Sequence, residues 1–105
     1  MSTRKPRLEI RWTELAHKDL ASALTFLHAE SPRAADGLAK VLESSLEQLR
    51  EFPAMGRAGR LAGTREILLP GWPYLVPYRV MHGSVEVLRV YHSSRKWPSR
   101  IPKKS

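Results

Sequence analysis

The side chains best suited to acid–base chemistry and phosphate binding are a histidine and several arginines in the last part of the chain. They lie in or beside segments whose sequence is typical of β-strands. His92 ends one run, and its imidazole can act as acid or base because its ordinary pKa lies near neutrality. Arg65 and Arg79 lie in two other runs, and a guanidinium can bind two phosphate oxygens at once. Metal-independent cleavage of a phosphodiester needs a base, an acid and a cation beside the phosphorane. We predict His92, Arg65 and Arg79 as a catalytic set.

Other basic and aromatic side chains in this region could hold an RNA strand through its phosphates and bases. The candidates are Arg57, Arg60, Arg95, Lys96 and Tyr91. Tyr91 has an alternative, because it is in phase with Val85 and Val87 and could pack toward the helices. On that reading Tyr91 belongs to the core and not to an RNA site.

The three catalytic candidates also have purely structural alternatives. Arg65 could form a salt bridge with Glu66, or with a helix carboxylate such as Glu43 or Glu47. Arg79 could be an ordinary solvated strand residue, and His92 could simply close the hydrogen bonds of a strand end. Sequence alone leaves these alternatives open.

Four segments alternate apolar and polar residues with the two-residue period of a half-buried strand. They are residues 7–12, 64–69, 74–80 and 85–92. His82-Gly83-Ser84 is a short turn signal between the last two segments, and it predicts a β-hairpin. Pro77 cannot donate a backbone hydrogen bond, so its strand should lie at a sheet edge or be bulged there.

Two helices are predicted between the first and second strands. The first begins after the N-cap Thr13 and the second at Ser31-Pro32, where Ser caps the helix and Pro occupies its first position. Pro53 ends the second helix. Apolar residues recur every three or four positions along each, namely Ala16, Leu20, Ala23 and Leu27, then Ala35, Leu38, Leu42, Leu46 and Leu49. The very short connection at residues 29–31 predicts an antiparallel pair.

The element order strand-helix-helix-strand-strand-strand predicts an α+β fold. A helical hairpin should cover one face of a small, twisted, mainly antiparallel sheet, because each helix has one apolar stripe. The other sheet face would then be available to Arg and His side chains. We expect a single domain over residues 1–105, with a core at about 8–98 and a basic, flexible tail at 99–105.

The net charge of +8 is unevenly distributed along the chain. Residues 13–52 hold four Lys or Arg against seven Asp or Glu, whereas residues 53–105 hold ten against two. This separation favours a polyanion or an acidic protein as partner. An apolar fraction of 42% indicates a folded protein. There is no cysteine, metal-ligand spacing or P-loop, so we expect no metal or cofactor. With no long apolar run, we expect a soluble cytoplasmic protein.

Several short motifs occur in a specific order between residues 8 and 98. They are Asp19-Leu20, Pro53-x-x-Gly56-Arg57, Gly63-Thr64-Arg65-Glu66, Tyr74-x-x-x-Tyr78-Arg79-Val80, and Val87-Leu88-x-Val90-x-His92 with Arg95 and Trp97. With the element order, they make the chain resemble the RelE/ParE superfamily of toxins from bacterial type II toxin–antitoxin systems. The resemblance implies a cognate antitoxin whose extended C-terminal segment wraps the toxin.

The resemblance implies two possible targets. RelE-like members cut mRNA in the ribosomal A site, and ParE-like members poison DNA gyrase. Leu75 stands where ribonuclease members often carry Arg or another polar group, whereas His92 stands where several place a catalytic Arg or His. ParE-like members can also carry His there. Our first expectation is ribosome-dependent mRNA cleavage, with ribosome and mRNA as partners. The alternatives are a gyrase inhibitor without catalysis and a basic nucleic-acid-binding module.

Overall fold

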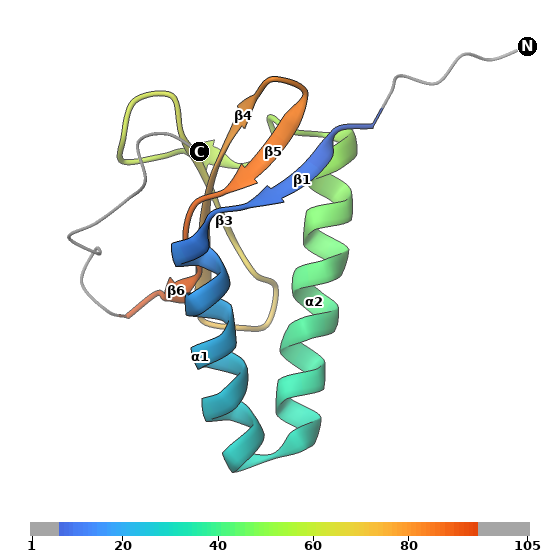
Figure 1. Cartoon of the computed structure of the whole chain (residues 1–105), viewed down its shortest axis with the longest axis vertical. Coiled ribbons are helices and arrows are strands. Elements are labelled where there is room, and N and C mark those ends of the chain that lie inside the picture. Colours follow the sequence, from blue (N-terminus) through green and yellow to red (C-terminus); the bar gives the residue numbers. More distant parts are fainter. Residues whose placement is uncertain (1–6, 95–105) are drawn as a thin grey trace, which may run out of the picture.

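Two long helices stand side by side against one face of a small sheet in the computed structural model, which describes residues 7–94 (Figure 1). Helix α1 (Glu14–Glu30) is capped by Thr13, whose hydroxyl accepts from the Ala16 N–H, and α2 (Pro32–Glu51) is capped by Ser31 in the same way. A single residue, Ser31, joins them, so the helices run antiparallel as predicted.

Within residues 7–94 the sheet has six strands, in the order β1-β5-β4-β3-β2, with β6 paired to β4. Their bounds are β1 (Glu9–Trp12), β2 (Arg57–Ala58), β3 (Arg65–Leu68), β4 (Tyr74–Met81), β5 (Ser84–Val87) and β6 (Tyr91–His92). Among the strand pairs that the structure describes, only β1–β5 is parallel, so the prediction of an α+β, mainly antiparallel fold is confirmed. The sequence pattern did not predict β2, which lies between the second helix and the strand predicted at residues 64–69, or the break between β5 and β6.

The core lies between α2, the first turns of α1, and the helix-facing side of the sheet. Leu38, Leu42, Leu46 and Leu49 form the buried stripe of α2 and meet Val76, Tyr78, Val85 and Val87 from β4 and β5. Burying each leucine contributes about 1.5–3 kcal/mol, so this stripe is a principal source of stability. In α1, Ala16 is the one fully buried residue, and that helix covers the sheet less completely than α2 does.

A two-residue turn joins β4 to β5. His82 and Gly83 have φ angles of 52° and 74°, and the flanking residues Met81 and Ser84 pair with each other. Positive φ at both central positions defines a type I′ turn, whose twist matches that of the strands it joins. The turn signal in the sequence therefore predicts this hairpin correctly.

A β-bulge separates β5 from β6. Tyr78 pairs with Val87, but Leu75 pairs with Tyr91, so two residues, Arg89 and Val90, lie opposite the single residue Val76. The extra residue reverses the alternation of side chains beyond it. Val90 therefore joins the core cluster. The prediction that Tyr91 packs toward the helices is wrong, since its pairing with Leu75 places it on the opposite face.

Pro77 lies in the interior of the sheet and is fully buried, so of the two predicted positions, an edge or a bulge, the edge is wrong. Its carbonyl accepts from the Leu88 N–H at 2.9 Å, but Pro77 has no N–H to return to the Leu88 carbonyl. The Thr13 hydroxyl donates to that carbonyl instead, at 2.9 Å. A proline is tolerated here because a side chain replaces its missing donor and a bulge in the facing chain begins at the same place.

Candidate functional site

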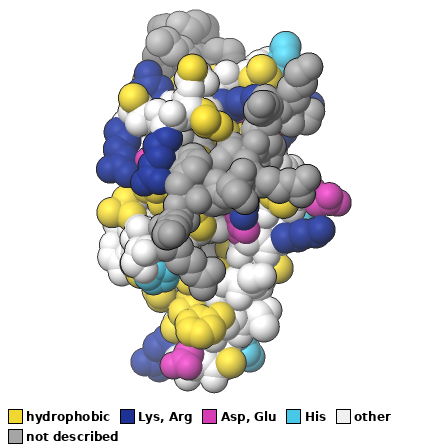
Figure 2. All heavy atoms as spheres, turned by 90° about the vertical axis from the view of Figure 1, so that its left-hand side faces the viewer, with side chains coloured by type: hydrophobic (Ala, Val, Ile, Leu, Met, Phe, Trp, Pro, Cys, Tyr) yellow, Lys and Arg dark blue, Asp and Glu magenta, His cyan; other side chains and the backbone are white. Residues whose placement is uncertain are grey.

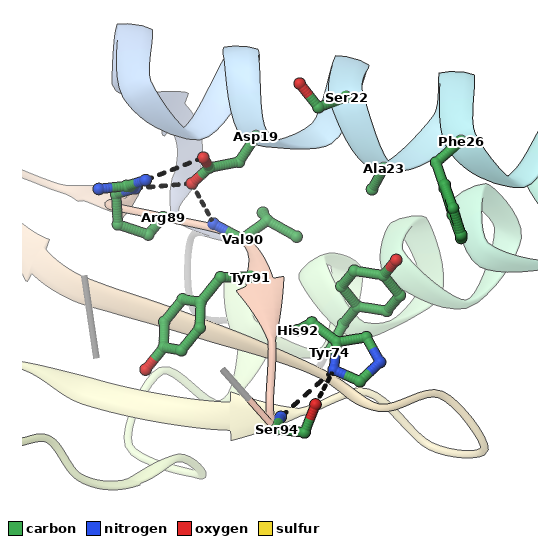
Figure 3. Close-up of a pocket in the computed structure, with 10 residues that line it drawn as sticks. All are labelled: Asp19, Ser22, Ala23, Phe26, Tyr74, Arg89, Val90, Tyr91, His92 and Ser94. Carbon is green, nitrogen blue, oxygen red and sulfur yellow. Dashed lines mark hydrogen bonds and ion pairs between the residues drawn. The ribbon is translucent and has the colours of Figure 1, made fainter. Parts of the chain in front are cut away.

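A groove lies between α1 and the end of the sheet that carries β6 (Figure 3). It encloses about 660 Å³. Asp19, Ala23 and Phe26 line it from α1, and Tyr74, Arg89 and His92 line it from the sheet side. We call it the α1–β6 groove. Phe26 is 64% exposed, so the groove has an apolar rim on the helix.

An ion pair forms one wall of this groove. Arg89 donates to Asp19 through Nε at 2.6 Å and Nη2 at 2.9 Å, and the Val90 N–H donates to the same carboxylate at 3.0 Å (Figure 3). The bonds to Asp19 raise the pKa of Arg89 further above its ordinary value, against the opposing effect of burial. Because both bulge residues bind Asp19, this carboxylate holds the bulge against α1.

His92 lies at the floor of the groove, with its ring at 71° to that of Tyr74 and the ring centroids 5.5 Å apart. Its Nδ1 accepts from the Ser94 N–H at 3.3 Å and lies 2.7 Å from the Ser94 hydroxyl. The neutral ring therefore carries its proton on Nε2. This arrangement orients the imidazole and leaves it partly exposed.

Three of the predicted phosphate-binding arginines are bound to buried carboxylates. Arg57 donates to Glu66 at 3.1 Å, and Arg60 Nε lies 3.9 Å from the same carboxylate. Arg79 donates to Glu86 at 2.5 Å. Glu66 and Glu86 are only 2% and 3% exposed, so these pairs satisfy carboxylates that would be costly to bury alone. The reading of Arg79 as a solvated residue is therefore wrong.

Arg65 bonds neither to Glu66 nor to a helix carboxylate. Its Nη1 donates to the Gly56 carbonyl at 2.8 Å. The same loop is held by Tyr78, whose hydroxyl donates to the Pro53 carbonyl at 2.7 Å and accepts from the Gly56 N–H at 3.0 Å. This network explains the Pro53-x-x-Gly56 motif, since a Cβ on Gly56 would lie 2.5 Å from the Tyr78 hydroxyl.

The three predicted catalytic residues are divided between two sheet faces. Arg65 pairs with Tyr78 and His92 pairs with Tyr74, which are both core residues, so these two side chains lie on the helix-facing side. Arg79 lies opposite Glu86 on the other face. The expectation that one open face carries all three is wrong, because the bulge and the register of β3 reverse two of them. Their catalytic roles remain predictions.

Of the remaining RNA-binding candidates, Tyr91 is buried, and burial raises the pKa of its hydroxyl while the charges of Arg60, Arg57 and Arg89 oppose that rise. Arg95 and Lys96, like Trp97 and the predicted tail, lie outside the described residues. On the face turned to the viewer in Figure 2, Lys and Arg side chains gather mainly over the upper part of the molecule, and the lower, helical part exposes hydrophobic groups.

Sequence reasoning missed the roles of Asp19, Glu66 and Glu86. Their positions in the sequence could have indicated these roles. A lone acidic residue on an otherwise apolar helix or strand face is buried only when a cation pairs with it. The sequence motifs include Asp19 and Glu66, and Glu66 is also considered as a partner of Arg65, whereas Glu86 has no predicted role. Within residues 7–94 no cluster of three or more His, Cys, Asp or Glu could hold a metal ion. No helix among those residues is long and apolar enough to span a membrane.

Comparison with known proteins agrees with this fold. The model of the ParE toxin of the type II toxin–antitoxin system parDE matches residues 10–97. Y4kP, a candidate toxin of Sinorhizobium fredii, is 37% identical over 92 residues, which cover 88% of this chain and 95% of Y4kP.

Two solved structures share the architecture. The chromosomal ParDE system of P. aeruginosa matches with a TM-score of 0.73 at 22% identity, covering 84% of this chain and 98% of that one. The toxin–antitoxin complex RelBE2 of Mycobacterium tuberculosis matches with a TM-score of 0.54 at 25% identity, covering 87% and 97%. The family model covers nearly the whole sheet and the helical hairpin, and the strand order agrees with it. The chain therefore belongs to the ParE toxins of type II toxin–antitoxin systems, within the RelE/ParE superfamily.

Proposed function

We propose that this toxin stops growth by binding DNA gyrase in the cytoplasm, without catalysis of its own, and that a cognate antitoxin neutralises it. The observation that carries this proposal is that the arginines predicted to bind phosphate already have partners within the fold. Arg57, Arg60 and Arg79 are bound to Glu66 and Glu86, and Arg65 is bound to the Gly56 carbonyl. A guanidinium held by a buried carboxylate contributes little positive charge to a phosphorane, because its charge is already compensated.

The distribution of these groups supports the same proposal. General acid–base cleavage of RNA needs the base, the acid and the cation within hydrogen-bonding reach of one phosphate. His92 and Arg79 lie on opposite faces of the sheet. Leu75, at the position where ribonuclease members often carry a polar group, is buried at 3% exposure. A surface of packed ion pairs and apolar side chains is better suited to a protein partner than to phosphate chemistry.

Ribosome-dependent mRNA cleavage is the second candidate, and one observation favours it. His92 is held by Ser94 and Tyr74 at the floor of the α1–β6 groove, with Nε2 carrying the proton of the neutral ring. An oriented, partly exposed imidazole of this kind can serve as a general acid once it is protonated to the imidazolium. The chain also shares its architecture with the RelBE2 complex.

One pair of assays on the same purified toxin separates the two candidates. In the first, the toxin is added to gyrase, ATP and relaxed plasmid, and the supercoiled and linear products are measured with and without the antitoxin. In the second, the toxin is added to a reconstituted translation reaction and the mRNA 3′ ends are mapped. Loss of supercoiling with intact mRNA supports the proposal. Cuts at ribosome-occupied codons with unimpaired gyrase contradict it and establish the second candidate.

A further inference from the structure

A second groove lies between α2 and β3, and it encloses about 300 Å³. Its lining comes from α2, from the loop that follows α2 and from β3, and includes Gln48, Met55, Arg57, Ile67, Leu68 and Pro70. We call it the α2–β3 groove. Among the described residues, none lines both this groove and the α1–β6 groove. Strands β4 and β5 separate it from β1, so it lies on the opposite side of the sheet from that strand.

Two exposed apolar side chains line the α2–β3 groove. Leu68 on β3 is 58% exposed, and Met55 in the loop after α2 is 47% exposed. Strand β2 pairs only with Arg65 and Glu66, and no other described strand covers that side of β3 at Leu68. One exposed apolar side chain is ordinary on a protein surface, but two in a single groove form an apolar surface that a partner can bury.

The loop that carries Met55 is held from inside the fold. Tyr78 is fully buried, and its hydroxyl donates to the Pro53 carbonyl at 2.7 Å and accepts from the Gly56 N–H at 3.0 Å. The Met55 N–H donates to the Phe52 carbonyl at 3.1 Å. The backbone of Met55 is therefore fixed although its side chain is exposed. A preorganised surface of this kind loses less conformational entropy when it binds, which favours affinity.

Arg57 provides this groove with a hydrogen-bond donor for an acidic group. Its side chain is 66% exposed, and its Nε and Nη2 donate to Glu66 Oε1 at 3.3 and 3.1 Å. No acceptor among residues 7–94 bonds to its Nη1. Glu66 also lies 3.9 Å from Arg60, so one carboxylate serves two guanidinium groups. Because a guanidinium has five N–H donors, Arg57 can hold Glu66 and the carboxylate of a partner at the same time.

The lining favours a protein segment over other occupants. A volume of about 300 Å³ is at the lower limit for pockets that enclose a small molecule. No aromatic side chain of the described residues lines the groove, so an unpaired base would have no ring to stack on. A second copy of the chain also carries a net charge of +8, which repels the first copy. Methionine and arginine, in contrast, are enriched at protein–protein interfaces.

We propose that the α2–β3 groove binds gyrase, and that it takes a gyrase segment with a large apolar side chain beside a carboxylate. Met55 and Leu68 bury the apolar side chain, and Nη1 of Arg57 binds the carboxylate. Within the Pro53-x-x-Gly56-Arg57 motif, the proline and the glycine fix the loop, and Met55 and Arg57 reach the partner. This inference rests on the proposed function and names the surface of the toxin that makes the contact.

Oxidative footprinting of the unaltered toxin tests the contact. Met55 and Met81 are exposed to similar extents, 47% and 39%, and peroxide converts an exposed methionine to its sulfoxide. Leu75 is the register partner of Leu68, and Met81 lies roughly 20 Å further along β4 at the usual rise of a strand. Met81 therefore serves as the internal control.

The toxin is oxidised alone and with saturating gyrase, and mass spectrometry of its peptides follows both methionines. Gyrase should slow the oxidation of Met55 at least fivefold and change that of Met81 less than twofold. Equal rates for Met55 with and without bound gyrase would overturn the proposal. Protection of Met55 by plasmid DNA or by the antitoxin, and not by gyrase, would assign the groove to that partner instead.

Leu68→Glu tests the apolar contact. It should weaken gyrase binding at least tenfold, because it removes an apolar side chain and places a negative charge where the carboxylate of the segment binds. Met81→Glu is the matched control, since it makes a similar change at an exposed position on the same face of the sheet, and it should bind within twofold of the parent toxin. Unchanged binding by a folded Leu68→Glu would contradict the proposal. If circular dichroism shows that this variant does not fold, the footprint of the unaltered toxin decides.

Arg57→Gln tests the polar contact. It should weaken gyrase binding about fivefold, because the carboxylate of the segment loses its donor, while Arg60 remains beside Glu66. Arg33→Gln is the matched control, because it removes the same charge at an exposed position on α2. Equal binding by the two variants would contradict the role of Arg57.

Inhibition of gyrase by the parent toxin separates this proposal from the proposed function. If the parent toxin and Leu68→Glu inhibit supercoiling equally, the gyrase target stands and the groove assignment fails. If the parent toxin leaves supercoiling unimpaired, the gyrase target itself fails, and the groove assignment fails with it. Loss of inhibition in Leu68→Glu alone, with antitoxin binding within twofold of the parent, would support both.

Discussion

The Thr13 hydroxyl donates a 2.9 Å hydrogen bond to the Leu88 carbonyl, 75 residues further along the chain. The same hydroxyl accepts from the Ala16 N–H at 3.1 Å as the N-cap of α1. One side chain therefore starts the helix and replaces the donor that Pro77 cannot supply to the Leu88 carbonyl. This bond joins the beginning of the helical layer to the point where the sheet is interrupted.

We expect Thr13→Val to lower the free energy of unfolding by about 2 kcal/mol. Roughly 1 kcal/mol is the usual loss for an N-cap, and the rest reflects a buried carbonyl left without a donor. Denaturant titration followed by circular dichroism measures the change. Thr13→Ser keeps the hydroxyl and should lose less than about 0.5 kcal/mol. Equal losses in both variants would show that the hydroxyl is unimportant.

Asp19→Ala should lower the free energy of unfolding by about 3 kcal/mol, which is more than the loss expected for Thr13→Val. It leaves the largely buried Arg89 guanidinium and the Val90 N–H without their acceptor. The double variant Asp19→Ala, Arg89→Ala should recover part of that loss, since it removes the uncompensated charge. Thermal unfolding of Asp19→Ala, Arg89→Ala and the double variant gives the comparison. Simple additivity of the two single changes would argue against coupling through this ion pair.

Alkaline pH should weaken the fold through Tyr78. Burial raises the pKa of its hydroxyl above the ordinary value of 10.0, against the opposing effects of the Gly56 N–H bond and the Arg65 charge. A group with a raised folded-state pKa stabilises fully below its unfolded pKa, and the contribution is lost as pH rises further. The free energy of unfolding should therefore fall as pH rises above about 10.

The comparison variant for this effect is Tyr78→Phe. It should be less stable at pH 8, because it loses the bond to the Pro53 carbonyl, but its stability should fall less steeply above pH 10. Burial also raises the pKa of Tyr91, so the stability of Tyr78→Phe should still fall somewhat as pH rises. The double variant Tyr78→Phe, Tyr91→Phe should show a smaller fall. Identical slopes in parent and Tyr78→Phe would exclude this contribution.

His92→Ala should leave growth inhibition within about twofold of the parent toxin, because a gyrase-binding protein needs no general acid. The measurement is colony formation after induction without antitoxin, at matched protein levels. Tyr74→Leu serves as the comparison, since it removes the ring contact with His92 while keeping an apolar residue in the core. Abolished toxicity in His92→Ala, with wild-type levels of toxin, would instead support mRNA cleavage.

Much of the fold could be predicted from local patterns. The capping residues Thr13 and Ser31, the apolar period of α2 and the His82-Gly83 turn each act within a few residues, and each is where the sequence predicted it. Backbone capping and side-chain periodicity are local effects, so a single sequence carries them. These local patterns were enough to predict the order of the elements, and from that order the helical hairpin on a mainly antiparallel sheet.

The site could not be predicted in the same way, because side-chain direction depends on register between distant strands. One extra residue at Arg89–Val90 turns Tyr91 away from the helices and His92 toward them. Buried Glu66 and Glu86 take the arginines that sequence reasoning assigned to phosphate. Composition and periodicity thus determined which elements form and where the positive charge concentrates. Tertiary structure decided which face each charge occupies and which partner holds it, since a one-residue shift in pairing moves a side chain across the sheet.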